Sequence, residues 1–401
     1  MGGSRCGATV AVVWHDGFLR YDLGGEHPLH PVRLALTMDL ATRLGVLDRP
    51  VVSLRQPEPA GEGLLTLAHD QDYLDAVRRA PEEPFGVGHG LGTSDNPIFD
   101  HMHESSALIV GGSVLGAQSV WTGAAGHAVN IAGGLHHAMR SRASGFCVYN
   151  DPAVAIGWLL DQGAQRVAYV DVDVHHGDGV QARFYDDPRV LTVSLHQSPM
   201  TLFPGTGFPE EVGHGAAAGT SVNVALPAGT DDAGWLRAFH AVVPSLLRAY
   251  GPEVMVTQCG CDTHREDPLA ELALTVDGQR ASYLALHELA HELCGGRWLA
   301  LGGGGYGLVR CVPRAWTHLL AVATGNPLDP GTPVPHEWAE QVRRRGLRTP
   351  PPESMTDGGA ADWSAWQPAT VADASPLDRA ILNTRRAVFP LHGLDPHDPR
   401  D

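Results

Sequence analysis

The stretch 167–180, V-A-Y-V-D-V-D-V-H-H-G-D-G-V, ends an apolar run with ionisable side chains. Such a run predicts a buried parallel strand, and ligands of open α/β sheets lie beyond the carboxyl ends of these strands. If strand alternation continues, Asp171, Asp173 and His175 project to the same side. Two carboxylates and an imidazole held there without a cation would be costly, and this ligand set suits zinc or Fe(II).

A second apolar run, 253–259, is followed closely by Asp262. This run predicts a neighbouring strand. Asp262 is then expected at the carboxyl end of that strand, as Asp173 is at the carboxyl end of the first. Asp262 is therefore the natural third metal ligand. Glu266 and Asp267 compete for that role on composition alone.

Two glycine-rich segments carry further side chains suited to chemistry. In the first, Gly133 and Gly134 precede His136 and His137, and adjacent histidines offer their imidazoles to two different partners. In the second, four glycines at 302–305 precede Tyr306, and such a backbone approaches a ligand closely. A phosphate loop is a weak alternative for the second segment, because no Lys or Ser/Thr follows in the required pattern.

Composition restricts the class of partner. The chain has 401 residues, with 28 Lys+Arg against 45 Asp+Glu and a net charge of −17. This balance disfavours nucleic acid and anionic membranes, and it suits a basic ligand such as a lysine-rich peptide or a polyamine. The six cysteines form no C-x-x-C pair, and no apolar run is long enough to cross a bilayer. A cytoplasmic protein with reduced thiols is expected.

Predicted strands and helices alternate from residue 8 to about 323. Strands are expected at 8–14, 51–54, 127–131, 167–175, 189–196, 221–226, 253–259 and 298–301, and the main helices at 31–44, 70–77, 103–121, 152–160, 180–185, 233–250, 279–293 and 311–323. This alternation predicts one three-layer α/β domain with a single, mostly parallel sheet of about eight strands. We expect a catalytic domain over 1–325 and a proline-rich tail over 326–401, with helix near 377–388, packing on or extending that domain.

Seven ordered motifs resemble the histone deacetylase superfamily and its arginase-like fold. They are G-G-L-H-H-A, S-G-F-C-V-Y-N-D, V-D-V-D-V-H-H-G-D-G-V, L-T-V-S-L-H, F-P-G-T-G, Q-C-G-C-D-T and L-G-G-G-G-Y. Two further segments, Y-D-L-G-G-E-H-P and G-L-G-T-S-D-N-P-I-F, are similar to the bacterial acetoin-utilisation branch.

The resemblance implies a role for each matching residue. Zinc, or Fe(II), would be held by Asp173, His175 and Asp262. The catalytic groups would be His136 and His137 facing the attacking water, with Asp171 orienting His136 and Asp178 orienting His137, and Tyr306 donating to the substrate carbonyl. Substrate would meet Asp95 at the rim, Gly145, Phe146, Phe203, Leu269 and Gly304 along a tunnel, and Arg33 at an inner channel. One structural potassium ion would use Asp171, Asp173, His175, Ser194 and Leu195, and a second would use backbone oxygens near Phe184, Asp187 and Val190.

The implied activity is zinc-dependent removal of acetyl or other acyl groups from lysine side chains of proteins, with release of acetate. Metabolic enzymes such as acetyl-CoA synthetase are the expected substrates. The alternative is a deacetylase of small acetylated amines such as acetylpolyamines. An acyl-lysine reader is disfavoured because Tyr306 and the ligand set are present. A two-metal arginase-like site is disfavoured because His136 and His137 stand where further carboxylates would be needed. The sequence leaves acyl length and oligomeric state open.

Overall fold

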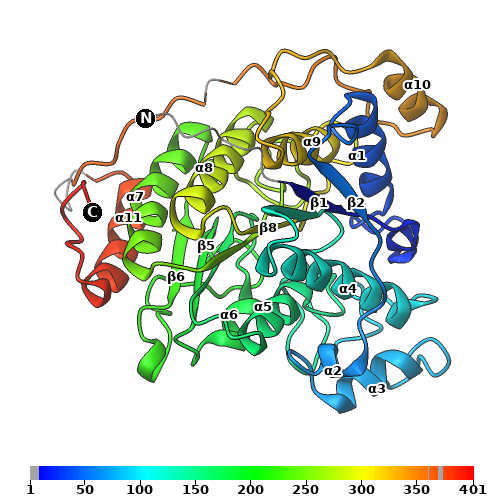
Figure 1. Cartoon of the computed structure of the whole chain (residues 1–401), viewed down its shortest axis with the longest axis horizontal. Helices are drawn as coiled ribbons and strands as arrows, with labels where there is room; N and C mark the ends of the chain where they lie inside the picture. The colour runs from blue at the N-terminus through cyan, green and yellow to red at the C-terminus, as the bar shows by residue number, and fades with distance from the viewer. Residues whose placement is uncertain (1–8, 360, 369–373) are drawn as a thin grey trace.

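One parallel sheet forms the centre of the protein (Figure 1). Across residues 9–359, 361–368 and 374–401, which the computed structural model describes, eight strands pair in the order β2-β1-β3-β8-β7-β4-β5-β6. Every neighbouring pair is parallel. The predicted single α/β sheet is therefore confirmed.

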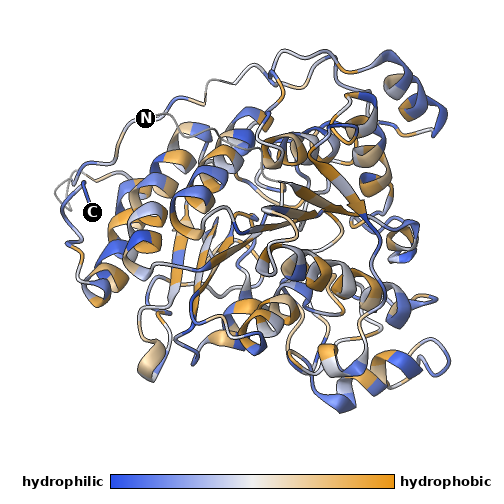
Figure 2. Cartoon of the chain, in the orientation of Figure 1, coloured by the Kyte–Doolittle hydropathy of each residue, from blue (hydrophilic) through white to orange (hydrophobic). Residues whose placement is uncertain are grey.

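The strands are short and mostly apolar, and Figure 2 shows them as the most hydrophobic part of the chain. They are β1 (Val10–Val13), β2 (Val52–Arg55), β3 (His127–Asn130), β4 (Val167–Asp171), β5 (Val190–Gln197), β6 (Ser221–Leu226), β7 (Val254–Gln258) and β8 (Trp298–Leu301). The two strands at the centre of the order, β8 and β7, are buried along their whole length. A strand covered on both faces needs apolar residues at successive positions, and this explains the continuous apolar runs.

Helices cover both faces of the sheet, which makes the three layers visible in Figure 1. One layer contains α1 (Val32–Arg43), α7 (Asp232–Tyr250), α8 (Val276–Cys294) and α9 (Val312–Ala323). The other contains α4 (Met102–Trp121), α5 (Asp151–Asp161) and α6 (Asp178–Phe184), with α2 (Glu62–Leu65) and α3 (Gln71–Arg79) beyond them. Neighbouring helices within a layer pack on one another, α4 on α5 and α1 on α9 most extensively.

The segment after residue 325 packs on two separate parts of this core. Helix α10 (His336–Arg344), which the sequence did not predict, lies against α1, and the indole of Trp338 donates to the carbonyl of Leu36 at 2.9 Å. Helix α11 (Pro376–Val388), which it did predict, packs on β6 and α7. Ile381 and Phe389 are fully buried in the main hydrophobic core.

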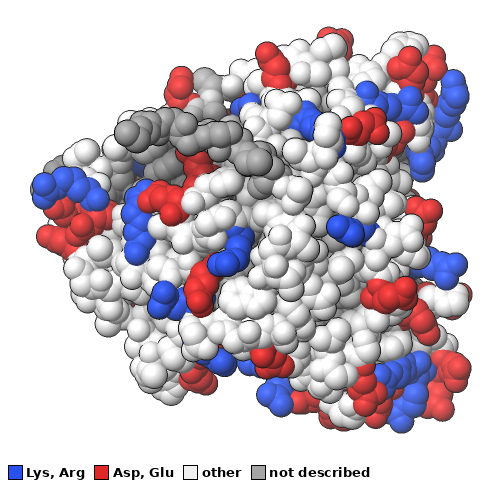
Figure 3. Space-filling view, viewed as in Figure 1, with Lys and Arg blue, Asp and Glu red and all other residues white. Residues whose placement is uncertain are grey.

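Charges of both signs are intermixed on the face drawn in Figure 3, and a dense group lies over α2 and α3. There Arg78 pairs with Glu62 at 2.9 Å and with Asp75 at 3.0 Å. Within the part of the chain that the structure describes, no helix is long and apolar enough to span a membrane. The five cysteines in that part are free and buried, and Cys6 lies outside it.

Candidate active site

Four adjacent strands bring the predicted site residues to one edge of the sheet. In the order β3-β8-β7-β4, each strand is followed by one of the polar segments singled out in the sequence. The loops after these strands carry, respectively, His136 with His137, Tyr306, Asp262, and Asp173 with His175. Parallel strands all end at the same edge, so segments far apart in the chain converge there.

The predicted ligand group is assembled and buried. Asp173, His175 and Asp262 offer ligand atoms that all lie within 4.8 Å of one another. The Nδ1 atom of His175 is 3.1 Å from Asp173 Oδ1 and 3.2 Å from Asp262 Oδ2. The two alternative candidates for the third ligand have other partners. Glu266 pairs with Arg310 at 2.9 Å, and Asp267 accepts the backbone N–H groups of Leu269 and Tyr306.

The strand predicted over 167–175 is shorter in the structure. Strand β4 ends at Asp171, so Asp173 and His175 lie in the loop that follows and the period of two no longer applies. Asp171 lies against His136, as the resemblance implied, with Oδ2 at 2.7 Å from Nδ1, and it also accepts the Tyr169 hydroxyl at 2.6 Å.

The ligand group fits a divalent cation. Asp173 Oδ2 accepts the Gln258 amide at 2.7 Å and the N–H of Gly304 at 2.8 Å, and Asp262 Oδ1 accepts the N–H of Val174 at 2.9 Å. Burial and the nearby Asp173 carboxylate raise the pKa of Asp262 to about 7. Two fully buried carboxylates sharing one imidazole are short of positive charge, which a divalent ion would supply.

A glycine is required where the loop after β8 meets these ligands. A Cβ atom on Gly304 would lie 2.0 Å from Asp262 Oδ2 and 2.8 Å from Asp173 Oδ2. Any side chain at this position would therefore occupy space that the ligands use.

Two imidazoles lie beside the ligand group, each backed by a carboxylate. His136 contacts Asp171, and His137 Nδ1 lies 2.7 Å from Asp178 Oδ1. The two Nε2 atoms are 3.0 Å apart, and all four side chains are buried. A carboxylate behind an imidazole fixes its tautomer and ring orientation.

The two imidazoles differ in charge. Burial lowers the pKa of His136, but Asp171 and Asp173 outweigh it and raise that pKa to about 9. Burial and the charge on His136 lower the pKa of His137 to about 4, against the effect of Asp178. At neutral pH this favours a charged His136, held by Asp171, and a neutral His137.

Tyr306 and Arg33 meet at the glycine loop. Asp267 Oδ2 accepts the N–H of Tyr306 at 2.8 Å. Burial, with help from Asp262 and Asp173, raises the pKa of the Tyr306 phenol well above its usual value, so the hydroxyl remains a donor. The buried Arg33 guanidinium donates to the carbonyls of Gly303 at 2.8 Å and Gly305 at 3.1 Å.

Aromatic rings wall a narrow cavity above the ligand group. Phe146 packs edge-on against Tyr306, with centroids 5.8 Å apart, and Phe203 packs against His137 at 5.0 Å. Phe146 has φ of 70°, an unusual conformation for a bulky residue and typical of functional sites. A Cβ on Gly145 would lie 2.4 Å from the His137 ring, so glycine lets Phe203 and His137 come together. The cavity is lined by Leu29, Gly134, Leu135, His136, His137, Gly145, Phe146, Cys147, Asp173, His175, Gly303, Gly304 and Tyr306.

Phe203, Asp95 and Leu269 lie outside that lining, and of the three only Phe203 packs directly on a lining residue, His137. Asp95 is exposed, and its carbonyl contacts the His27 ring at 3.3 Å, which in turn packs on Phe146 with centroids 4.5 Å apart. The half-buried Leu269 donates its N–H to Asp267, the residue that holds Tyr306. Asp95 and Leu269 are therefore each separated from the cavity wall by one intervening residue.

The predicted potassium ligands occupy two places near the site. Asp171 and Ser194 are direct partners in the β4–β5 register. Farther along, the Phe184 carbonyl accepts the N–H of Asp187 at 3.0 Å, and the Asp187 carbonyl accepts that of Val190 at 3.2 Å. The potassium roles stay predictions.

Supporting residues were missed by the sequence analysis. The buried Asp151 accepts the N–H groups of Gly134 and Leu135 immediately before His136. Its place at the end of the S-G-F-C-V-Y-N-D motif, opening α5, was the available signal. Leu29, which lines the cavity, comes from a loop distant in sequence and carried no signal.

The chain belongs to the histone deacetylase family, because the family model described as "Histone deacetylase domain" matches residues 27–323. It is an enzyme of the deacetylase class, a hydrolase. Among curated proteins it is 42% identical over 331 residues to the acetoin utilization protein AcuC of Bacillus subtilis (strain 168), covering 81% of this chain and 84% of the relative. It is 36% identical over 335 residues to the AcuC protein of Staphylococcus aureus (strain MRSA252), covering 82% and 85%.

Solved structures agree with this assignment. An HDAC homologue complexed with SAHA matches with a TM-score of 0.79 and 30% identity, and an HDAC homologue from Aquifex aeolicus with 0.78 and 30%. Each covers 93% of this chain and 100% of the solved chain. The predicted family, its acetoin-utilisation branch and its fold are confirmed.

Proposed function

We propose that this protein is a zinc-dependent amidohydrolase that removes acetyl groups from lysine side chains of proteins and releases acetate. The observation that carries the proposal is the buried group of Asp173, His175 and Asp262 beside two carboxylate-backed imidazoles. A divalent ion in such a site acts as a Lewis acid and lowers the pKa of the attacking water. The oxygen-rich ligand set also suits Fe(II).

His137 is the proposed general base. It is neutral at neutral pH, and Asp178 at 2.7 Å fixes the tautomer that leaves Nε2 free of a bound proton. His137 takes a proton from water during attack and returns it to the departing lysine amine. His136, held by Asp171, stays charged and stabilises negative charge that develops beside it.

Tyr306 is the proposed donor to the carbonyl oxygen of the substrate. Its phenol stays protonated, and Asp267 holds its backbone in place. A donor positioned before the reaction stabilises the tetrahedral oxyanion without reorganisation. Arg33, below the glycine loop, is the proposed anchor for the departing acetate, which is an anion.

The cavity supports a slender substrate chain. Phe146 packs edge-on against Tyr306 and Phe203 against His137, and Gly145 and Gly304 leave no side chain to block the cavity. A four-carbon lysine stem matches apolar walls of this kind. Asp95 and Leu269 would meet the substrate outside the cavity, where an exposed carboxylate suits peptide N–H groups.

The acetoin-utilisation relatives support a metabolic protein as substrate, and we propose acetyl-CoA synthetase as the first to test. The free, buried cysteines support a cytoplasmic location. Potassium at the two predicted positions would stabilise the loops around β4 and β5.

Acetate release from three substrates tests this proposal. Chelator-treated protein is reconstituted with zinc and given an acetyl-lysine peptide, acetylated acetyl-CoA synthetase or acetylspermidine. We expect the enzyme to turn over the acetyl-lysine peptide and acetylated acetyl-CoA synthetase. This turnover should disappear with chelator and return when zinc is added. Preference for acetylspermidine would move the function to the small-amine alternative, which the net charge of −17 also suits. No zinc-dependent turnover of any substrate would contradict the proposal.

A further inference from the structure

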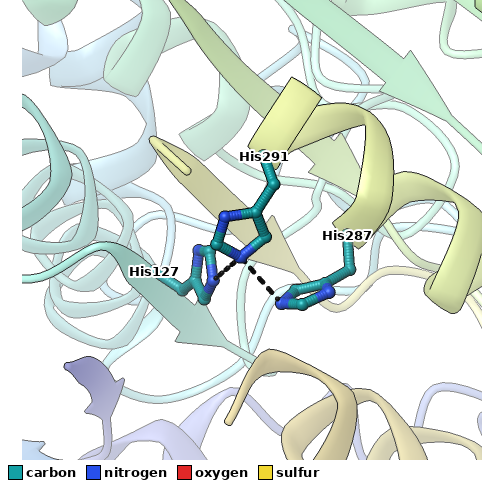
Figure 4. A group of neighbouring side chains, drawn as sticks. All are labelled: His127, His287 and His291. Atoms are coloured by element: carbon teal, nitrogen blue, oxygen red, sulfur yellow. Dashed lines mark hydrogen bonds between the residues drawn. The ribbon is translucent and has the colours of Figure 1, made fainter. Parts of the chain in front are cut away.

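A second group of potential metal ligands lies at the opposite edge of the sheet. His127 is the first residue of β3, whereas the proposed catalytic histidines follow the other end of that strand. His287 and His291 are one turn apart on α8. Figure 4 shows the three rings pointing toward one another. Their ligand atoms lie within 4.8 Å of one another.

The two short contacts that His291 makes are close to the nitrogen–nitrogen distances around a bound ion. His291 Nε2 is 3.1 Å from His127 Nε2 and 3.2 Å from His287 Nε2. A tetrahedral ion with metal–nitrogen bonds of about 2.0–2.1 Å separates its ligand nitrogens by about 3.3–3.4 Å. The observed separations are therefore close to those of a formed site.

Hydrogen bonding does not account fully for this arrangement. In a neutral imidazole, Nε2 carries either one proton or one lone pair. His291 Nε2 therefore cannot make good hydrogen bonds to both His127 and His287. A cation at the centre would accept a lone pair from each of the three Nε2 atoms.

The sequence of α8 contains a recognised ligand spacing. Residues 287–291 read H-E-L-A-H, and this pattern on a helix places two histidines on one face for zinc. His127 supplies a third ligand from another element. The surroundings favour metal binding over a hydrolytic active site. The Trp298 ring lies 5.7 Å from the rings of both His127 and His287, and Gly296 lies against His291. A substrate cleft would need the space that these residues occupy.

We propose that His127, His287 and His291 bind a divalent transition-metal ion of the zinc class. Imidazole ligands suit Zn²⁺, Cu²⁺ or Ni²⁺ and are unsuited to Mg²⁺ and Ca²⁺, which prefer oxygen. The burial of His127 opposes a charged imidazolium, and His291 is exposed, so water has access to a fourth position. The ion would tie the last turns of α8 to the start of β3.

Zinc stoichiometry tests the site. Full-length protein made without a histidine tag is stripped with chelator and titrated with Zn²⁺ alone. The wild type is expected to bind two ions, and the His287→Ala/His291→Ala variant one. The affinity of the lost site should fall by more than about 100-fold, beyond the effect of losing a residue that only hydrogen-bonds a ligand. His127→Ala should lower zinc affinity in the same way, but it opens a cavity in the core. The His287→Ala/His291→Ala variant is therefore the primary test.

Matched controls separate this site from the proposed active site. His214→Ala/His336→Ala removes two exposed histidines elsewhere and should leave both ions bound. Asp262→Ala should leave one ion, held by the three histidines, and zinc should still raise its melting temperature. Asp262→Ala protein that binds no zinc, or His287→Ala/His291→Ala protein that binds as much as wild type, would overturn the proposal. The wild type could instead bind one ion, and only His287→Ala/His291→Ala could lose it. That result would support the three-histidine site and count against a metal in the proposed active site.

Discussion

The two ends of β3 lie close to two contrasting groups of ligand side chains. Beyond the carboxyl end lie two carboxylates and one imidazole, all buried and held by Gln258 and backbone N–H groups. At the amino end three imidazoles converge, and one of them is exposed. Buried carboxylates are costly without a cation, whereas neutral imidazoles are not. We therefore expect the first group to depend on metal for its function and the second to bind metal without affecting chemistry.

The largest expected effect is at the carboxylate end. Asp262→Ala removes a ligand, and the several kcal/mol of transition-state stabilisation that a metal supplies corresponds to at least about a 1000-fold loss of kcat/KM. Acetate release from an acetyl-lysine peptide measures it. Activity within tenfold of wild type would exclude Asp262 from the metal site.

Tyr306→Phe should have the next largest effect. Loss of one oxyanion donor typically lowers turnover by about 100- to 1000-fold. Because the phenol is not a proposed ligand, zinc binding should stay unchanged when titrated in the same sample. An unchanged rate would remove Tyr306 from the mechanism.

Gly304→Ala should weaken zinc binding at the carboxylate end by about 10- to 100-fold, the range found when the surroundings of metal ligands are altered. The added methyl would lie 2.0 Å from Asp262 Oδ2. Gly63→Ala is the matched control, since a Cβ there meets nothing within 4 Å. Equal zinc affinity in the two variants would show that the glycine loop does not shape the site.

The smallest expected effect on catalysis is at the histidine end. His287→Ala/His291→Ala should keep kcat/KM within about twofold of wild type, because neither residue contacts the proposed active site. The assay is run with zinc saturating. A loss above tenfold in correctly folded protein would mean that the two ends of β3 are coupled.

The sequence predicted most of the active site but not all of its geometry. Asp173, His175 and Asp262 were recognisable because each follows an apolar run. The strand predicted over 167–175 was too long, since β4 ends at Asp171, whereas the contact of Asp171 with His136 was already implied by the family motifs. Helix α10 was not predicted, because its buried face is small and depends on α1 for its contacts, as with Trp338 and Leu36.

The amino-acid sequence alone determined the parallel α/β class, the family and the identity of the proposed ligands, because periodicity and motif spacing are local properties of a chain. Only the tertiary structure decided the distances between these carboxylates and imidazoles, where Leu29 and Asp151 contribute, and that His127 meets two histidines 160 or more positions away. These pairings depend on strand order and loop paths, and strand order follows from packing of the whole chain.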